Sequence, residues 1–261
     1  MRTISSLLGL LSLTAPVAAQ TIDVTSTERD YQLIATGYDY EFDDGVGASD
    51  ATTAAGVWEQ DVSVDLQDWY GADVSRGRAF HESDVFSTGI VADLSAESET
   101  LGSGMFYADA WSETQLVTSF DVNDRVRYSF EVSATTTDAG YAVATVSLSS
   151  GSGNLAYVRV WDGDAESESQ IGWLQAGSYT LDALAEAVAI DGAELSQTDI
   201  QLALRTYHAA DFEMDGDVDR RDRGRFKQAY LAGSPLADFD GDGDTDPTDW
   251  NLFRLAWRGK Q

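Results

Sequence analysis

The sequence predicts a mostly β protein: an antiparallel β-sandwich of jelly-roll type followed by a small all-α module. Residues 21–188 contain no proline and are rich in Ser, Thr, Val, Tyr and Gly. Short stretches there alternate apolar and polar side chains between turn residues, which is typical of a sandwich. After residue 197 the apolar spacing becomes helical, and one stretch occurs twice. We therefore predict the sandwich at 21–188, a linker at 189–197 and the helical module at 198–261.

Residues 1–19 have the pattern of a secretory signal peptide. A basic residue, Arg2, precedes an apolar stretch from Ile4 to Leu13, and the small residues Ala18 and Ala19 follow. A short buried helix is the alternative, but the apolar stretch is too short to span a bilayer and lies at the N-terminus. We expect cleavage after Ala19 and a mature chain that is secreted, either extracellular or at the cell surface.

The overall charge favours cations as partners. The chain of 261 residues has 16 Lys and Arg against 45 Asp and Glu, a formal charge of -29. The phosphates of nucleic acids and anionic membranes would be repelled over the whole surface, so neither is an expected partner. There is no cysteine, so any stabilisation beyond packing must come from metal rather than from disulfides. No segment of the mature chain is expected to span a membrane.

Individual strands are predicted in the second half of the sandwich region. Residues 126–133 (VRYSFEVS) alternate apolar and polar side chains, the period of a half-buried strand. Further strands are predicted at 141–149 and 155–162, each bounded by Gly, Asn, Asp and Ser. Residues 179–188 fit both helical spacing and alternation, and we assign them to a final strand.

Helical spacing follows the predicted linker. Ser196 and Asp199 have the arrangement of a capping box. The apolar residues after them recur three or four positions apart, namely Ile200, Ala203, Leu204 and Tyr207. We therefore expect a helix at 198–209.

The repeated stretch lies in the helical module. Residues 211–222 (DFEMDGDVDRRD) align without gaps with residues 238–249 (DFDGDGDTDPTD), 27 positions later. The segments that follow also align, and their aromatic and small residues match pairwise: Phe226 with Phe253, Ala229 with Ala256, and Tyr230 with Trp257. Each copy therefore predicts a loop and an exiting helix.

Both loops have the residue pattern of an oxygen-only metal site. Acidic residues occupy loop positions 1, 3 and 5, and glycine follows at position 6, where the chain must bend sharply. Position 7 is expected to offer a backbone carbonyl, position 9 to act through water, and position 12 to close the site from the first turn of the helix. Asp246 can also cap the second helix, with Pro247 in its first turn. The predicted ligands are Asp211, Glu213, Asp215, Asp217, Asp219 and Asp222, then Asp238, Asp240, Asp242, Asp244, Asp246 and Asp249.

Such multi-carboxylate coordination suits calcium and not zinc, so two Ca2+ sites are predicted. A bound dication would offset the repulsion between the carboxylates, and without it the loops should loosen. The alternative is an Asp-rich solvated turn. Glycine and all the carboxylates falling in register in both copies argue against it.

This tandem of twelve-residue loops ending in Asp, each followed by a helix, resembles a type I dockerin. The resemblance covers roughly residues 211–258 and implies a calcium-dependent adaptor on a secreted bacterial protein. It further implies docking onto a cohesin-type or other extracellular protein, often to carry polysaccharide-degrading enzymes or binding modules. Loop positions 10 and 11, which help to select the cohesin, hold Arg220 and Arg221 in one copy but Pro247 and Thr248 in the other.

A structural or calcium-buffering EF-hand pair is the rival interpretation of the module. The helix expected at 198–209 precedes the first loop, so this unit could be a complete EF-hand. Against it, position 12 is Asp in both loops rather than the usual Glu.

No catalytic residue can be nominated in the sandwich. His81 and His208 are the only imidazoles, and there is no cysteine nucleophile. A serine triad would need His81, whereas an ordinary structural histidine is the simpler interpretation, as it is for His208. A glycosidase needs two suitably spaced carboxylates, but the sequence offers too many acids to choose a pair. Residues 163–170 (GDAESESQ) are predicted to be a solvated loop rather than a further metal site.

Aromatic residues could form a sugar-stacking platform or the sandwich core. Trp69 and Tyr70 lie in a turn-like stretch and are the better candidates for exposure; the others are Trp58, Trp111, Trp161 and Trp173. The sequence thus favours a secreted, non-catalytic protein whose tail tethers a carbohydrate-binding sandwich. The alternatives are a polysaccharide-degrading enzyme anchored by the same module, and a cell-surface structural or adhesion protein.

Overall fold

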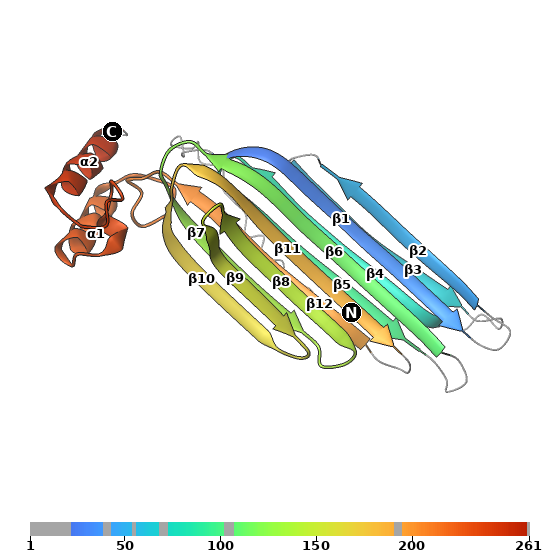
Figure 1. Ribbon diagram of the computed structural model, residues 1–261. Helices are drawn as coiled ribbons and strands as arrows, with labels where there is room; N and C mark the ends of the chain where they lie inside the picture. Colours follow the sequence, from blue (N-terminus) through green and yellow to red (C-terminus); the bar gives the residue numbers. More distant parts are fainter. Residues whose placement is uncertain are drawn as a thin grey trace. The chain divides into compact units, whose positions relative to one another are not determined.

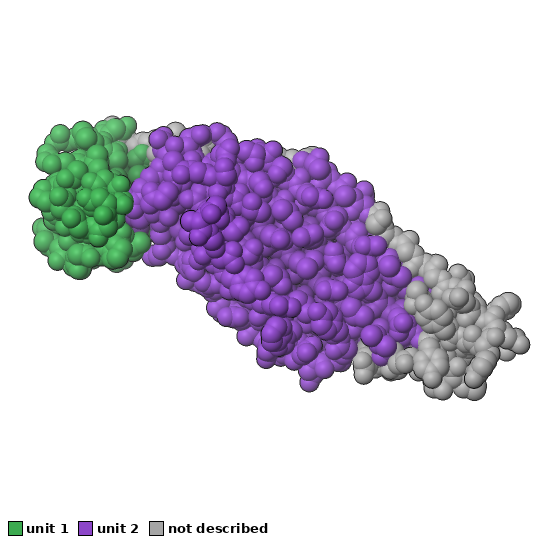
Figure 2. Space-filling model, in the orientation of Figure 1, with its two compact units in different colours: residues 1–20, 207–261 green, residues 21–206 purple. Residues whose placement is uncertain are grey.

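The computed structural model describes residues 22–38, 43–53, 56–67, 73–101, 107–190 and 195–259. The chain divides into two compact units (Figure 2). The larger unit is residues 21–206, and the residues from Tyr207 on belong to the smaller one. The predicted signal peptide and the pair Trp69 and Tyr70 lie outside the described residues.

The larger unit is an antiparallel β-sandwich of two six-stranded sheets (Figure 1). Sheet A has the order β2-β1-β6-β11-β8-β9, and sheet B has the order β10-β7-β12-β5-β4-β3. The strands are β1 Ile22–Tyr38, β2 Asp43–Thr52, β3 Gly56–Gln67, β4 Asp73–Phe86, β5 Gly89–Thr100, β6 Tyr107–Val122, β7 Val126–Thr136, β8 Tyr141–Ser150, β9 Gly153–Trp161, β10 Ala165–Leu174, β11 Gly177–Ile190 and β12 Leu195–Tyr207.

The last eight strands have the order of a jelly roll. β6-β11-β8-β9 lie in sheet A, and β5-β12-β7-β10 lie in sheet B, so most successive strands cross between the sheets. The strands β1 to β4 extend the two sheets by two strands each. The predicted fold class is therefore confirmed.

Period-two burial builds the core between the sheets. In β11 the alternate residues Leu181, Ala183 and Ala185 are fully buried, while their neighbours are partly exposed. The strands predicted at 126–133, 141–149, 155–162 and 179–188 are all present, as β7, β8, β9 and β11.

Where β1, β4, β5 and β6 face one another, the interior is polar. His81 is fully buried, and its ring nitrogens lie 2.9 Å from Thr114 Oγ1 and 3.0 Å from Ser83 Oγ. Ser98 Oγ–H donates to the carbonyl of Ala187 at 2.9 Å. Burial, with the nearby charge of Arg29, lowers the pKa of His81 to about 3. The ring is therefore neutral at ordinary pH and closed to substrates, which favours the structural interpretation of this histidine.

The helix predicted at 198–209 is wrong, because residues 195–207 form strand β12. Its apolar residues fit both periods, but Ser196 and Thr198 also point into the core. There they donate to the carbonyls of Tyr141 and Glu186 at 2.8 and 2.7 Å, which removes the cost of burying a hydroxyl.

The boundary between the units consequently moves from 198 to 207. Of the predicted linker at 189–197, the first two residues end β11 and the last three begin β12, while residues 191–194 lie outside the described residues.

The solvated loop predicted at 163–170 is also wrong. A turn precedes Ala165, and residues from there to Leu174 pair with β7 as the edge strand β10. Most of its acidic and polar residues are exposed. Charged side chains on an edge strand discourage pairing with other chains, which explains a strand with the composition of a loop.

The smaller unit contains helices α1 (Arg220–Leu231) and α2 (Pro247–Arg258) and the short 3-10 helix η1 (Pro235–Ala237). Its core repeats with the sequence: Phe226 and Phe253, the same position in the two copies, stack with ring centroids 4.0 Å apart. Phe212 and Phe239, also equivalent, pack edge-on against Phe226 at 5.4 and 5.8 Å. No helix in the described part of the chain is long and apolar enough to cross a membrane.

Candidate metal centres

Both acidic loops have the same unusual backbone. Position 6 has positive φ in each copy, 93° at Gly216 and 97° at Gly243, as the sequence predicts. Position 4 also has positive φ, 58° at Met214 and 81° at Gly241. The sequence does not predict this second bend in the first loop, because methionine is rarely placed there. Gly241 at the matching position of the second loop is the signal that could have revealed it.

Each loop ends in a capped helix. Asp219 and Asp246 are the N-cap residues of α1 and α2, and their side chains accept from the first-turn backbone amides. Asp222 and Asp249 complete a capping box in each case. The predicted cap at Asp246, with Pro247 in the first turn, is confirmed.

The two closing aspartates hold their loops together through backbone amides. Asp222 is fully buried, and its carboxylate accepts from Phe212 N and Glu213 N at 2.6 and 3.0 Å and from Asp219 N at 2.7 Å. Asp249 is equally buried and accepts from the three equivalent amides. Charge-assisted bonds of this kind are strong, so these residues order the loops.

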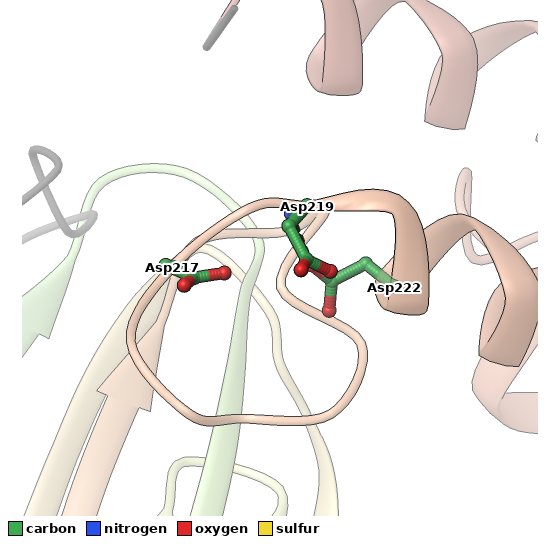
Figure 3. Close-up of side chains that lie close together, drawn as sticks. All are labelled: Asp217, Asp219 and Asp222. Carbon is green, nitrogen blue, oxygen red and sulfur yellow. Dashed lines mark hydrogen bonds between the residues drawn. The ribbon is translucent and has the colours of Figure 1, made fainter.

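Three carboxylates of the first loop lie together. Asp217, Asp219 and Asp222 each place one oxygen within 4.8 Å of the others. Figure 3 shows the Asp219 and Asp222 carboxylates side by side, with that of Asp217 turned toward them across the loop. Asp217 thus brings its side chain to the group, whereas the loop pattern assigns it a backbone carbonyl.

In the second loop all six predicted acids fall into two such groups. Asp238, Asp240 and Asp242 form one, and Asp244, Asp246 and Asp249 form the other, again within 4.8 Å. Neighbouring carboxylates repel: the charge of Asp242, with some loss of hydration, raises the pKa of the exposed Asp244. A cation between them would relieve this repulsion.

The other predicted acids of the first loop, Asp211, Glu213 and Asp215, do not form such a group among the described residues, but two of their oxygens are buried without a hydrogen-bond partner. Asp211 is 2% exposed, and its Oδ2 accepts from Gly216 N at 2.9 Å, but its Oδ1 has no hydrogen-bond partner. Burial raises the pKa of Asp211 to about 6. Glu213 Oε1 also has no hydrogen-bond partner, and Arg221 lies 3.9 Å away. Buried carboxylate oxygens normally have partners, and both atoms are of the kind that a cation can contact.

The donor set indicates a hard cation. Every group is made of carboxylates, with no histidine or cysteine among them. Oxygen-only sites suit calcium, magnesium or manganese rather than zinc or copper. The carboxylates present could therefore hold a metal ion in each loop.

The residues predicted to contact a partner are accessible. Arg220, Arg221, Pro247 and Thr248 are all exposed at the starts of α1 and α2. Leu231 and Leu255 on the same helices are 73% and 66% exposed. The basic residues of α1 are likewise all exposed: Arg220, Arg221, Arg223, Arg225 and Lys227.

The other residues singled out in the sequence lie away from the acidic loops or have local structural contacts. Trp58 packs beside His81 with ring centroids 4.5 Å apart, and Arg125 lies 4.5 Å from the Trp173 ring centroid. His208 Nδ1 accepts from Ala210 N at 3.1 Å, a local structural role. Trp161 is 50% exposed on β9.

Comparisons with known proteins add little. No protein-family model matches the chain, and no curated protein matches it. An arabinose-bound α-L-arabinofuranosidase aligns with 57% of this chain and 26% of its own, at TM-score 0.22 and 11% identity. A structure of infectious bursal disease virus, Gt strain, aligns with 74% of this chain and 58% of its own, at TM-score 0.24 and 11% identity. The enzymatically active domain of bacteriophage CBA120 tailspike protein 4 aligns with 67% of this chain and 19% of its own, at TM-score 0.22 and 10% identity. This chain thus spans less than two thirds of each, and the similarity is too low to support an argument about function.

Proposed function

We propose that this is a secreted calcium-binding protein whose dockerin-like module tethers a carbohydrate-binding β-sandwich to an extracellular protein. One observation carries the calcium part: two loops with the same backbone gather carboxylates, and the first leaves Asp211 Oδ1 buried without a partner. Bound calcium would supply that partner and neutralise the crowded charges. Asp211 and Asp238 at position 1, and Asp222 and Asp249 at position 12, would hold the two ions.

Calcium binding is expected to stabilise the module. The described core of this unit has five buried apolar residues: Ala210, Phe212, Phe226, Ala237 and Phe253. A core of this size contributes little stability by itself, and small domains commonly depend on a metal. An ion that binds only the folded loops adds its binding free energy to folding.

The exposed helices support the tethering role. α1 presents five basic side chains in a protein whose formal charge is -29. A surface of that sign favours a partner that presents an acidic patch. The equivalent start of α2 offers Pro247 and Thr248 instead, so the two halves of the module differ in the partner surface they suit.

Calorimetry of the dialysed full-length protein tests the calcium part. Titration with CaCl2 should give two bound ions per chain, and MgCl2 should bind more weakly because it demands a rigid octahedral site. The absence of calcium uptake would remove the basis of the proposal.

A capture assay tests the tether. Immobilised cohesin-type domains should retain the protein in calcium and release it in chelator, and the double variant Arg220→Glu, Arg221→Glu should lower retention. The double variant Pro247→Ala, Thr248→Ala is the matched control for the other half. Retention that persists in chelator contradicts the tether, and two bound ions without any retention would favour the structural EF-hand pair.

One observation favours an enzyme as the second candidate. Glu113 on β6 and Glu186 on β11 lie directly opposite each other on adjacent strands. Burial, and then the charge of Glu186, raises the pKa of Glu113, while Trp111 Nε1–H donates to Glu186 at 3.0 Å. Opposed residues have Cβ atoms about 5 Å apart, so the two carboxyl groups can reach the separation of about 5–5.5 Å that retaining glycosidases use. Release of reducing sugar that disappears in Glu113→Gln would establish this class; no release from any polysaccharide would exclude it.

A further inference from the structure

The outward face of sheet A gathers exposed aromatic side chains. In β9 the alternate residues Ala156, Val158 and Val160 are at most 3% exposed and belong to the core. Tyr157 and Trp161 therefore point to the opposite face, and each is 50% exposed. They are separated by four residues of extended chain, or about 13 Å.

The strand register extends this aromatic group across the sheet. Tyr141 on β8 pairs with Val188 on β11, and Val188 pairs with Trp111 on β6. Because directly opposed residues share a face, Tyr141 and Trp111 lie on the same face, in one row that runs across the strands. Tyr141 is 45% exposed. The next row begins with Trp161, which pairs with Val143. The Arg159 guanidinium lies 5.0 Å from the Trp161 ring centroid, which orients the ring without covering it.

Fixed hydrogen-bonding groups lie between the aromatic rings. Trp111 Nε1–H donates to Glu186 at 3.0 Å, and Gln115 Nε2–H donates to Asp182 Oδ1 at 3.1 Å. Both acids are partly buried in β11, so their positions are constrained. A ligand on this face would meet flat apolar rings alternating with carboxylate and amide oxygens, which are good acceptors for hydroxyl groups.

A hollow lined by hydroxyl groups continues the same face. It has a volume of about 510 Å³ and lies where β6, β11 and β8 end. Asp121 is the carboxylate in its wall and accepts from Ser178 Oγ–H at 2.6 Å. Seven hydroxyl-bearing residues line it: Thr25, Ser119, Ser149, Ser150, Ser178, Tyr179 and Thr180.

Charge restricts what can bind here. Among the described outward residues of β1, β6, β8, β9 and β11, Arg159 is the one base, whereas Glu28, Glu113, Asp182 and Glu186 are acidic. The negative electrostatic potential of this face repels anionic polymers and also a second copy of the same face. The outward face of sheet B is different: Arg78 forms an ion pair with Asp61 at 2.8 Å, and Arg76 with Asp65 at 2.9 Å.

We propose that the outward face of sheet A binds a neutral polysaccharide, whose sugar rings stack on Trp161, Tyr157 and Tyr141 and whose hydroxyl groups donate to the carboxylates between them. Stacking uses the apolar faces of the sugar rings, and the acceptors select hydroxyl groups over anionic substituents. This deepens the carbohydrate-binding part of the proposed function and does not depend on the calcium module.

The experiment uses the full-length chain in calcium buffer. Depletion from solution measures binding to microcrystalline cellulose, and affinity electrophoresis measures binding to mixed-linkage β-glucan, galactomannan and alginate. We expect retention by at least one neutral polysaccharide and none by anionic alginate, with quenching of tryptophan fluorescence. Retention by alginate alone, or by none of the four, overturns the inference.

Variants place the site on this face. Trp161→Ala and Tyr157→Ala should each weaken binding roughly tenfold, because each removes one stacking surface. Trp161→Phe keeps a flat ring and should retain most of the affinity. Ile171→Ala is the matched control, since Ile171 is 53% exposed on the outward side of sheet B. Unchanged binding in both alanine variants overturns the inference; two calcium ions bound to Trp161→Ala would show that the module remains intact.

Discussion

Two buried titratable residues, His81 in the sandwich and Asp211 in the C-terminal module, are accommodated differently. In the sandwich, His81 is fully buried and both of its ring nitrogens have hydroxyl partners from the protein itself. In the module, Asp211 is nearly as buried and its Oδ1 has no partner. The ring nitrogens of His81 thus have partners within the sandwich, although the hydroxyl groups of Thr27 and Thr118 in the same unit are buried without one. The unpaired atom of Asp211 is instead a carboxylate oxygen, which an external cation can satisfy. The difference predicts that the two units respond separately to metal, mutation and acid.

Removal of calcium should have the largest effect and should act on the module alone. One ion at a hundredfold excess over its dissociation constant adds about 2.7 kcal/mol to the stability of the folded state, so two ions add roughly twice that. Differential scanning calorimetry in calcium should show two unfolding transitions, one for each unit. Chelator should lower the midpoint temperature of the module's transition only. A shift of both transitions would break the comparison.

Phe226→Ala should come next, because Phe226 stacks on Phe253 at the centre of the module. Truncation of a fully buried phenylalanine costs about 3–5 kcal/mol. Both calcium sites should weaken together in calorimetry, since the rings join the two copies. Phe130→Ala, a similar truncation in the sandwich core, should lower the melting temperature of the sandwich and leave calcium affinity unchanged.

Asp249→Asn and Asp222→Asn compare the two loops directly. Each variant replaces a carboxylate that accepts hydrogen bonds from three backbone amides. A hydrogen bond to a charged group contributes about 1.5–3 kcal/mol to the stability of the folded state. We expect a loss of about 3 kcal/mol for either variant and calcium stoichiometry reduced from two ions to one. A variant that still binds two ions with unchanged melting would show that its aspartate does not close the site.

Acid should weaken the sandwich through His81. The unfolded chain binds a proton at this residue near pH 6.5, whereas burial lowers the folded pKa to about 3. The folded state therefore loses stability as pH falls from 6.5 toward 3, by about 1.4 kcal/mol per unit, or roughly 2 kcal/mol at pH 5. Urea unfolding at pH 7 and pH 5 measures this slope, which should disappear in His81→Gln. An unchanged slope in that variant would assign the effect to other groups.

Met214→Gly should produce the smallest change, a gain. Met214 has φ 58°, a conformation that costs an ordinary L-residue about 1–2 kcal/mol, whereas Gly241 at the same loop position avoids that cost. Replacement should raise the stability of the module by about 1 kcal/mol, measured by thermal melting in calcium. Gly241→Ala should change melting in the opposite direction; equal effects of both variants would contradict the strain argument.

The acidic loops could be predicted because their determinants are local. Gly216, the cap at Asp246 and the closing role of Asp222 all depend on contacts within about twelve residues of chain. The same locality explains the correct assignment of β7 and β9, whose alternation is visible in a short window. The positive φ of Met214 was not predicted, because methionine rarely adopts that conformation and its residue type gives no sign of it.

The sequence by itself determined the mostly β character of the larger unit and the repeated acidic loops, since period, glycine and carboxylate spacing act over a few residues. Only the tertiary structure decided that residues 195–207 are a strand, because Ile200 pairs with Leu94, far away in the chain. It also decided which aromatic residues share a face: Trp161 and Trp111 join one surface through the register of four strands. Register is set by which residues the opposing sheet buries, and a local pattern does not contain that information.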